Sequence, residues 1–241
     1  EADGLIYAGV DGAQLTWMDA KVGGWVVTPR KGKAVEINAL WYNALKIMSL
    51  LAREINLPGE STRYDNLAGK VCKSFHDVFW YDEGQYLYDS IDGEIRNSAI
   101  RPNQIFAVSL PYPMLSKAQQ RRVVDVVKEH LLTPRGLRSL SPKDKDYSGR
   151  YCGNPYERDR AYHQGTVWAW LIGPYISAFA KAYAVENDTI QYIKRLLLTF
   201  HEHLFEAGLG SISEIFDGDS PHIPRGCISQ AWSVGEILRA Y

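Results

Sequence analysis

This sequence has no large excess of positive or negative charge, few cysteines and no long apolar run, and each of these features excludes a class of protein. The 27 Lys and Arg residues nearly balance 28 Asp and Glu, for a net charge of −1. No nucleic-acid or membrane partner is therefore expected from charge. No apolar run approaches the roughly 20 residues of a membrane span, and the start Glu1-Ala2-Asp3-Gly4 does not resemble a signal peptide. The three cysteines are widely spaced, which predicts reduced thiols and a cytoplasmic location.

Patterns for cofactors and metals are scarce as well. Glycine-rich phosphate loops of the Walker or dinucleotide type are absent. His201 and His203 are two residues apart, so they do not share a helix face and do not indicate a metal site. No Ser-His-Asp arrangement can be identified from the sequence. The sequence therefore predicts neither a cofactor nor a metal.

Aromatic residues, in contrast, are plentiful. The 241 residues include seven Trp and 15 Tyr. Aromatic rings suit the apolar faces of sugars, while the polar tips of Trp and Tyr form hydrogen bonds. Large buried helix interfaces use the same residues, so this composition favours a glycan-binding protein without establishing one. Length and an apolar content of 46% predict one sizeable domain over residues 1–241.

Periodicity predicts a helical protein with a loop-rich beginning. Turn signals at Asp11-Gly12 and Gly23-Gly24 and the lack of a helical stripe indicate loops up to residue 35. From Glu36 the apolar residues recur with a period of 3.6 until Pro58-Gly59. Further helices are expected after Ser61, over Arg101–Leu110, from the capping box of Ser116 and Gln119, over His163–Tyr183 with a kink at Gly173-Pro174, over Asp188–Glu206, and up to Tyr241.

The connections between these helices alternate in length. Phe79–Tyr88 predicts a small hairpin, and the polar residues 133–162 predict a long functional loop. About seven helices in antiparallel hairpins, with long loops gathered at one end, suit an all-α fold of the α/α toroid type.

Two stretches contain a carboxylate that could take part in acid–base chemistry. In Leu15–Lys21, Asp19 stands among large apolar residues, where desolvation would favour the protonated form that a general acid needs. The alternative is a buried Asp that caps a turn. In Ser211–Gly218, Glu214 is the second candidate, although it could be an ordinary loop carboxylate, or Asp217 or Asp219 could take its role. Inverting glycosidases hold two such carboxyls roughly 6.5–9.5 Å apart.

The first stretch, continued through Val26–Arg30 and Glu36–Leu45, resembles the amylo-α-1,6-glucosidase domain of glycogen debranching enzymes. The resemblance implies a toroid of six helix hairpins, of which this chain would be the C-terminal part, without the first helices. It implies an inverting hydrolase that removes the α-1,6-linked glucose stub from glycogen or another branched α-glucan. Asp19 would protonate the bridging oxygen, and Glu214 would activate water.

Other segments match the family's substrate-binding motifs. Arg101-Pro102-Asn103-Gln104 offers a guanidinium and two amides suited to sugar hydroxyls, with capping and a surface ion pair as the alternative. Tyr162–Trp168 resembles a string specific to toroidal glycosidases. The expected binding residues are Trp17, Glu36, Arg101, Gln104, His163, Gln164 and Trp168. Glu36 could instead be the acid, and Trp17 and Trp168 could be ordinary core residues.

Two rival functions remain open at this point. A different toroidal α-glucosidase, or an inverting phosphorylase with Arg101 or Arg138 at its phosphate, would have similar patterns. A non-catalytic glycan-binding domain is the rival from another class. The helices that the resemblance implies to be missing would leave apolar faces open, which predicts self-association or a covering partner.

Overall fold

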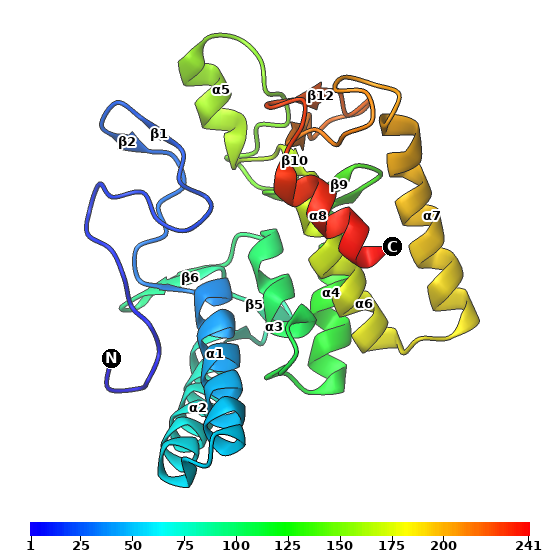
Figure 1. Cartoon of the computed structure of the whole chain (residues 1–241). Helices are drawn as coiled ribbons and strands as arrows, with labels where there is room; N and C mark the ends of the chain where they lie inside the picture. The colour runs from blue at the N-terminus through cyan, green and yellow to red at the C-terminus, as the bar shows by residue number, and fades with distance from the viewer.

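Helices dominate the computed structural model, which describes all of residues 1–241 (Figure 1). α1 and α2 form an antiparallel hairpin, and α6 packs against α3, α4, α7 and α8. The α-helices are α1 (Val35–Glu54), α2 (Pro58–Phe79), α3 (Phe106–Ser109), α4 (Lys117–Leu131), α5 (Pro155–Tyr162), α6 (Ile172–Tyr183), α7 (Asn187–His203) and α8 (Ala231–Ala240), with 3₁₀ turns at Pro102–Ile105 and Ala169–Leu171.

Local sequence signals set several of these helix boundaries. Pro58 begins α2 at a position where its missing N–H group costs nothing. Ser116 accepts a hydrogen bond from the backbone N–H of Gln119, and the Gln119 side chain accepts one in return, which confirms the predicted capping box. Asn154 and Glu157 form a second capping box at the start of α5. The sequence prediction of a plain loop over 133–162 was therefore wrong, because this box starts a two-turn helix there.

The all-α prediction is correct in its helices and incomplete in its strands. Twelve short strands form four small antiparallel sheets. They are β1 (Lys21–Val22), β2 (Trp25–Val26), β3 (Lys33–Ala34), β4 (Trp80–Tyr81), β5 (Tyr86–Leu87), β6 (Ser90–Asp92), β7 (Ile95–Asn97), β8 (Leu132–Thr133), β9 (Gly136–Arg138), β10 (Val167–Trp168), β11 (Ile215–Phe216) and β12 (Pro224–Arg225).

The sheet β12-β11-β10-β9-β8 brings two predicted functional motifs together. Val167 on β10 pairs with Phe216 on β11, and Trp168 pairs with Ile215. Residues 163–165 thus form a turn, Val167–Trp168 a strand and Ala169–Leu171 a 3₁₀ turn, and the predicted kinked helix over His163–Tyr183 begins only at Ile172. Gly173-Pro174 lies in the first turn of α6, where proline does not interrupt the hydrogen bonding of the helix.

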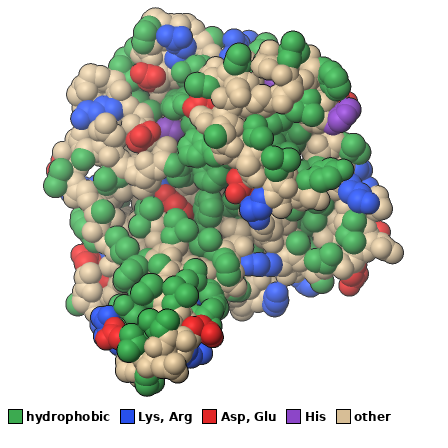
Figure 2. Space-filling model, in the orientation of Figure 1, with side chains coloured by type: hydrophobic (Ala, Val, Ile, Leu, Met, Phe, Trp, Pro, Cys, Tyr) green, Lys and Arg blue, Asp and Glu red, His purple; other side chains and the backbone are tan.

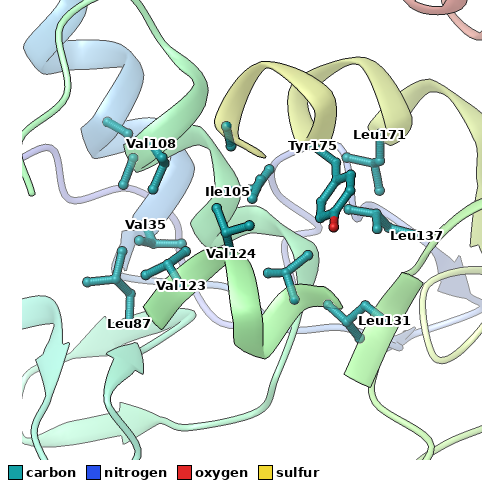
Figure 3. Close-up of a cluster of buried hydrophobic side chains, with 14 of the residues drawn as sticks. Val35, Leu87, Ile105, Val108, Val123, Val124, Leu131, Leu137, Leu171 and Tyr175 are labelled. Carbon is teal, nitrogen blue, oxygen red and sulfur yellow. The ribbon is translucent and has the colours of Figure 1, made fainter. Parts of the chain in front are cut away.

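One cluster of buried hydrophobic residues runs through the chain from Leu5 to Phe216. Figure 3 shows its central part, where side chains of α1, α3, α4 and α6 meet those of the neighbouring strands. Val123, Val127 and Leu131 face this core from α4, as their spacing predicts. Packing against this core fixes the ends of the helices and strands, from which the polar loops project.

Large apolar side chains are also exposed along α1. Leu40, Ile47, Met48, Leu50 and Leu51 are all accessible to solvent. Figure 2 shows hydrophobic side chains gathered on the lower lobe, where Figure 1 places α1 and α2. None of the helices has the length and apolar character needed to cross a membrane.

Candidate active site

Glu214 lies just before β11, and two donors hold its carboxylate in place. The Tyr162 hydroxyl donates to Oε1 at 2.5 Å, and the backbone N–H of Cys227 donates to Oε2 at 2.9 Å. Glycine at 226 suits this arrangement, because its φ is +66° and a Cβ atom there would lie 2.4 Å from Oε2 and displace the carboxylate. Glu214 is 8% exposed and lines a cavity of about 670 Å³. A carboxylate with two fixed donors and access to a cavity suits a general base.

Tyr162 ends α5 and supports this carboxylate. Burial and the hydrogen bond to Glu214 raise the pKa of Tyr162 far above its ordinary value. Its hydroxyl therefore stays protonated, and stays a donor, throughout the neutral range. Tyr162 reaches Glu214 because β10 and β11 are paired, which places the segment after α5 beside the segment before β11.

The two carboxylates that could have replaced Glu214 have other partners. Asp217 forms an ion pair with Arg225 at 2.9 Å and accepts a hydrogen bond from the backbone N–H of Tyr151. Asp219 accepts a hydrogen bond from the Tyr147 hydroxyl at 2.9 Å. Of the three, only Glu214 lines the cavity.

Asp19 is exposed at the end of a firmly anchored segment. Met18 and Ala20 on either side are buried, and the Nε1 of Trp17 donates to Asn103 Oδ1 at 2.7 Å. The carboxyl itself is not enclosed by apolar groups, so the expected desolvation of Asp19 was wrong. Burial alternates along this segment: the side chains of Met18 and Ala20 point inward, and the side chain of Asp19 between them points toward solvent.

Trp17 connects the Asp19 segment to the Glu214 segment. Its ring meets the rings of His163, Trp168 and Trp170 edge-on, at centroid distances of 5.1–5.3 Å. Trp168 in turn pairs with Ile215, the residue after Glu214. The aromatic cluster of Trp17, His163, Trp168 and Trp170 therefore connects the segment that carries Asp19 to the strand that follows Glu214.

Glu36 belongs to a buried network of charges. Arg30 forms two hydrogen bonds with Glu36 and two with the carboxylate of Asp89. Burial alone would lower the pKa of Arg30, but the charges of Asp89 and Glu36 outweigh it and raise that pKa. Since both oxygens of Glu36 face Arg30, Glu36 is not available as the acid, and that alternative was wrong.

Arg101 and Gln164 face a second, polar cavity. Arg101 donates to the carbonyl oxygens of Ser139 and His163, and its Nη2 donates to Gln164 Oε1 at 2.5 Å. Arg101 and Gln164 line a cavity of about 500 Å³. Gln104 lies inside the fold instead, where its amide contacts the backbone N–H of Leu87 and the carbonyl oxygen of Arg101. The structure therefore brings Arg101 and Gln164 to a cavity and leaves Gln104 as a support for the 3₁₀ turn.

Comparisons with known proteins identify the family of this chain. A family model described as amylo-alpha-1,6-glucosidase matches residues 1–239. The chain belongs to the amylo-α-1,6-glucosidase family. The family places the chain among the glycoside hydrolases. A similar curated protein is the glycogen debranching enzyme of Saccharomyces cerevisiae, which is 24% identical in an alignment of 290 positions that covers 98% of this chain.

Solved structures share the fold of this family member. A sialidase aligns with a TM-score of 0.65 and 14% identity, over 89% of this chain and 19% of its own. A mannosylglycerate hydrolase from Thermus thermophilus aligns with a TM-score of 0.61 and 13% identity, over 86% of this chain and 45% of its own. An uncharacterised protein from the same organism aligns with a TM-score of 0.60 and 14% identity, over 86% of this chain and 46% of its own. The chain spans 19% of the length of the yeast relative.

Two of the expected binding residues of this amylo-α-1,6-glucosidase family member, Trp168 and His163, are almost fully enclosed and line none of the described cavities. Trp168 is only 1% exposed, and its Nε1 donates to the carbonyl oxygen of Tyr162, so it is a core residue and not a stacking platform. His163 is fully buried and stacks on Trp168 with a centroid distance of 5.1 Å. Neither nitrogen of His163 has a hydrogen-bond partner. Burial, and then the charges of Arg101 and Arg30, lower the pKa of His163 to about 3.

Replacing His163 by Phe is expected to stabilise the protein and to flatten its response to acid. Two unpartnered buried nitrogens are removed, which should raise the free energy of unfolding at pH 7 by about 1–3 kcal/mol. Between the ordinary histidine pKa of 6.5 and the folded value of about 3, the unfolded chain binds one more proton than the folded chain. Wild-type stability should therefore fall by up to about 1.4 kcal/mol per pH unit of acidification from this residue alone.

Urea unfolding at pH 7, 6 and 5 measures both effects. The His163→Phe variant should lose this part of the slope, whereas His201→Gln, at an exposed position on α7, should keep it. Equal slopes for wild type and His163→Phe would contradict a neutral, buried His163.

Sequence reasoning missed Tyr162 and Arg30 as parts of the site. The only signal for Tyr162 was its place next to His163 in the matched motif, since its contact with Glu214 depends on the β10–β11 pairing. Arg30 is the last residue of the matched stretch Val26–Arg30, but its partner Asp89 is 59 residues away in the sequence. No group of three or more His, Cys, Asp or Glu side chains is arranged to hold a metal ion.

Proposed function

We propose that this chain removes the α-1,6-linked glucose branch stub from glycogen or a related limit dextrin, with inversion. The observation that carries the proposal is Glu214, a carboxylate held by Tyr162 and by the backbone of Cys227 at the wall of a cavity. Family membership supports the α-1,6-glucosidase chemistry. The proposed acid is Asp19. Trp17, on the same segment, packs against Trp168, and Trp168 pairs with Ile215, the residue after Glu214.

In the proposed reaction, Asp19 gives its proton to the bridging oxygen while Glu214 takes a proton from water. The water attacks the anomeric carbon from the opposite face, and the bond between that carbon and the bridging oxygen breaks. The protonated oxygen stays on the main chain as a hydroxyl, and glucose leaves with inverted configuration. Each oxygen of Glu214 accepts one hydrogen bond and keeps a free lone pair for the water. Holding the base in one orientation lowers the entropic part of the barrier.

The contacts of two arginines favour hydrolysis over phosphorolysis. Arg101 donates to two carbonyl oxygens and to Gln164, and Arg138 donates to the carbonyl oxygen of Gly218 at 2.9 Å. These were the two candidates for a phosphate site, and both have partners within the chain. Water is therefore the proposed nucleophile.

The proposed setting is an α/α toroid in the cytoplasm. The exposed apolar face of α1 supports a covering partner, either further helices of the same toroid or a second copy of the chain. The three unpaired cysteines, Cys72, Cys152 and Cys227, support a reducing compartment. Sedimentation of this chain at several concentrations distinguishes a self-associating face from one that stays open.

The test of the proposed function is the release of free glucose from a phosphorylase limit dextrin, with Asp19→Asn as the control variant. We expect glucose that appears first as the β-anomer in a proton NMR time course and that is abolished in the control. Turnover that requires phosphate would identify a phosphorylase instead. Binding of the dextrin without release would identify a glycan-binding module and overturn the proposed hydrolysis by this chain.

A further inference from the structure

We propose that Trp25 and Tyr156 form a separate subsite that holds a glucose ring of the α-glucan chain, away from the bond that is cleaved. Trp25 lies on β2 and Tyr156 on α5, and neither belongs to the hydrophobic core. The inference rests on the proposed α-glucan substrate and adds a position at which that substrate is held.

The two rings form an exposed aromatic platform. Trp25 is 40% exposed and Tyr156 is 52% exposed. Their centroids are 5.5 Å apart and their planes are 30° from parallel. Both rings line one cavity of about 380 Å³, which falls within the size range of small-molecule sites. The apolar face of a pyranose ring packs well on such a surface, because aromatic rings contribute a large contact area with little loss of side-chain freedom.

Two charged groups without partners and one amide surround the platform. Asp146 and Arg160 line the same cavity, and their side chains make no ion pair or hydrogen bond within the chain. Gln164 lines it as well, and its Nε2 reaches only the carbonyl oxygen of Val27 at 3.5 Å. A carboxylate, a guanidinium and an amide can each bind a pair of neighbouring sugar hydroxyls. An aromatic face with a rim of planar polar groups favours a neutral polyhydroxylated ligand over an apolar or strongly charged one.

Helix α5 places this subsite on the opposite side from the candidate base. Tyr156 and Arg160 are four residues apart and line the platform cavity. Arg158 lines the cavity of Glu214, and Tyr162 bonds to Glu214 itself. Residues two positions apart on a helix point in nearly opposite directions. The platform therefore holds a glucose unit other than the one whose bond Glu214 would cleave.

Gln164 connects the platform to the polar cavity of Arg101. Gln164, Asp146 and Val27 line both cavities, and Gln164 Oε1 accepts the hydrogen bond from Arg101. An oligosaccharide that is bound on the platform can therefore extend into the polar cavity of Arg101. In Figure 1, α5 stands beside the β1–β2 hairpin, against which it packs, so the two elements that carry the rings are held together.

The test is to measure by calorimetry the dissociation constant of maltopentaose for the wild type, Trp25→Ala and Tyr156→Ala. Loss of either ring should weaken binding by about tenfold, which is the effect of one well-packed aromatic contact. Phe205→Ala, which removes a ring that is 72% exposed but lines none of the described cavities, should bind as wild type does. Trp25→Phe, which keeps a ring, should recover most of the affinity even if Trp25→Ala is less stable.

This measurement does not depend on catalysis, because maltopentaose has no α-1,6 bond. Glu214→Gln should leave its dissociation constant unchanged. Tight binding that survives in both alanine variants, or no binding by the wild type, would overturn the subsite. If glucose release fails while Trp25→Ala still weakens binding, the proposed hydrolysis is wrong and the subsite stands.

Discussion

Replacing Glu214 by Gln is expected to lower kcat by about 10²–10⁴-fold, the usual contribution of a general base, with little change in KM. The variant should fold normally, because both hydrogen bonds of Glu214 can be kept. The Gln oxygen can accept from the backbone N–H of Cys227, and the Tyr162 hydroxyl can reverse its role and accept from the Gln amide. What is lost is the ability to take a proton from water. Steady-state rates of glucose release measure the effect.

Asp219→Asn is the matched control, since Asp219 lies on the same loop and accepts a hydrogen bond from Tyr147 but does not line the cavity. Its kcat should stay within a few-fold of wild type. Full activity of Glu214→Gln, or a larger loss in Asp219→Asn, would show that the base has been misplaced. The raised pKa of Tyr162 adds a pH condition: ionisation of this tyrosine should cause no loss of activity between pH 7 and 10.

Replacing Arg30 by Met is expected to lower the free energy of unfolding by about 3–5 kcal/mol, as is typical when one partner of a buried ion pair is removed. Arg30 is almost completely buried and lies between Glu36 and Asp89. Without it, the only other cation near Asp89 is Arg101, whose Nε is 3.9 Å from Asp89 Oδ2. Arg30 also donates to the Thr16 hydroxyl, so the Asp19 segment should loosen and activity should fall with stability.

The adjacent residue provides the control for this variant. Lys31 pairs with Asp11 and Asp92 at the surface, where such pairs contribute about 0–1 kcal/mol. Lys31→Met should therefore change stability by less than about 1 kcal/mol. Chemical unfolding of the two variants beside wild type makes the comparison. Similar losses in both, or a negligible loss in Arg30→Met, would contradict the buried network as a source of stability.

Short-range patterns could be predicted from the sequence, and long-range pairings could not. The 3.6-residue period from Glu36 onward and the Ser116 capping box each involve residues within a few turns, and both helices are present, although Met48 and Leu51 on α1 are exposed. Val167–Trp168 were placed in a helix because apolar residues continue into α6. Their strand is formed by partners at Leu137 and Ile215, which no local pattern contains.

The same division applies to the candidate site. The motif with Glu214 was found from the sequence, but its donors come from α5 and from the turn after β12. Glu36 was read as a free carboxylate because Asp89 and Arg30 are brought to it only by the folded chain. Asp19 was expected to be desolvated because its neighbours are apolar, yet side-chain direction leaves it exposed. Residue type and spacing thus located the carboxylates, and their environments depended on tertiary structure.

The two faces of α5 have a consequence for how the protein can be altered. The proposed subsite and the proposed base involve different side chains of one eight-residue helix. Substitutions at Tyr156 and Arg160 change one face, and those at Arg158 and Tyr162 change the other. We therefore expect that evolution or laboratory engineering can alter the proposed binding of the glucan chain without altering the proposed cleavage.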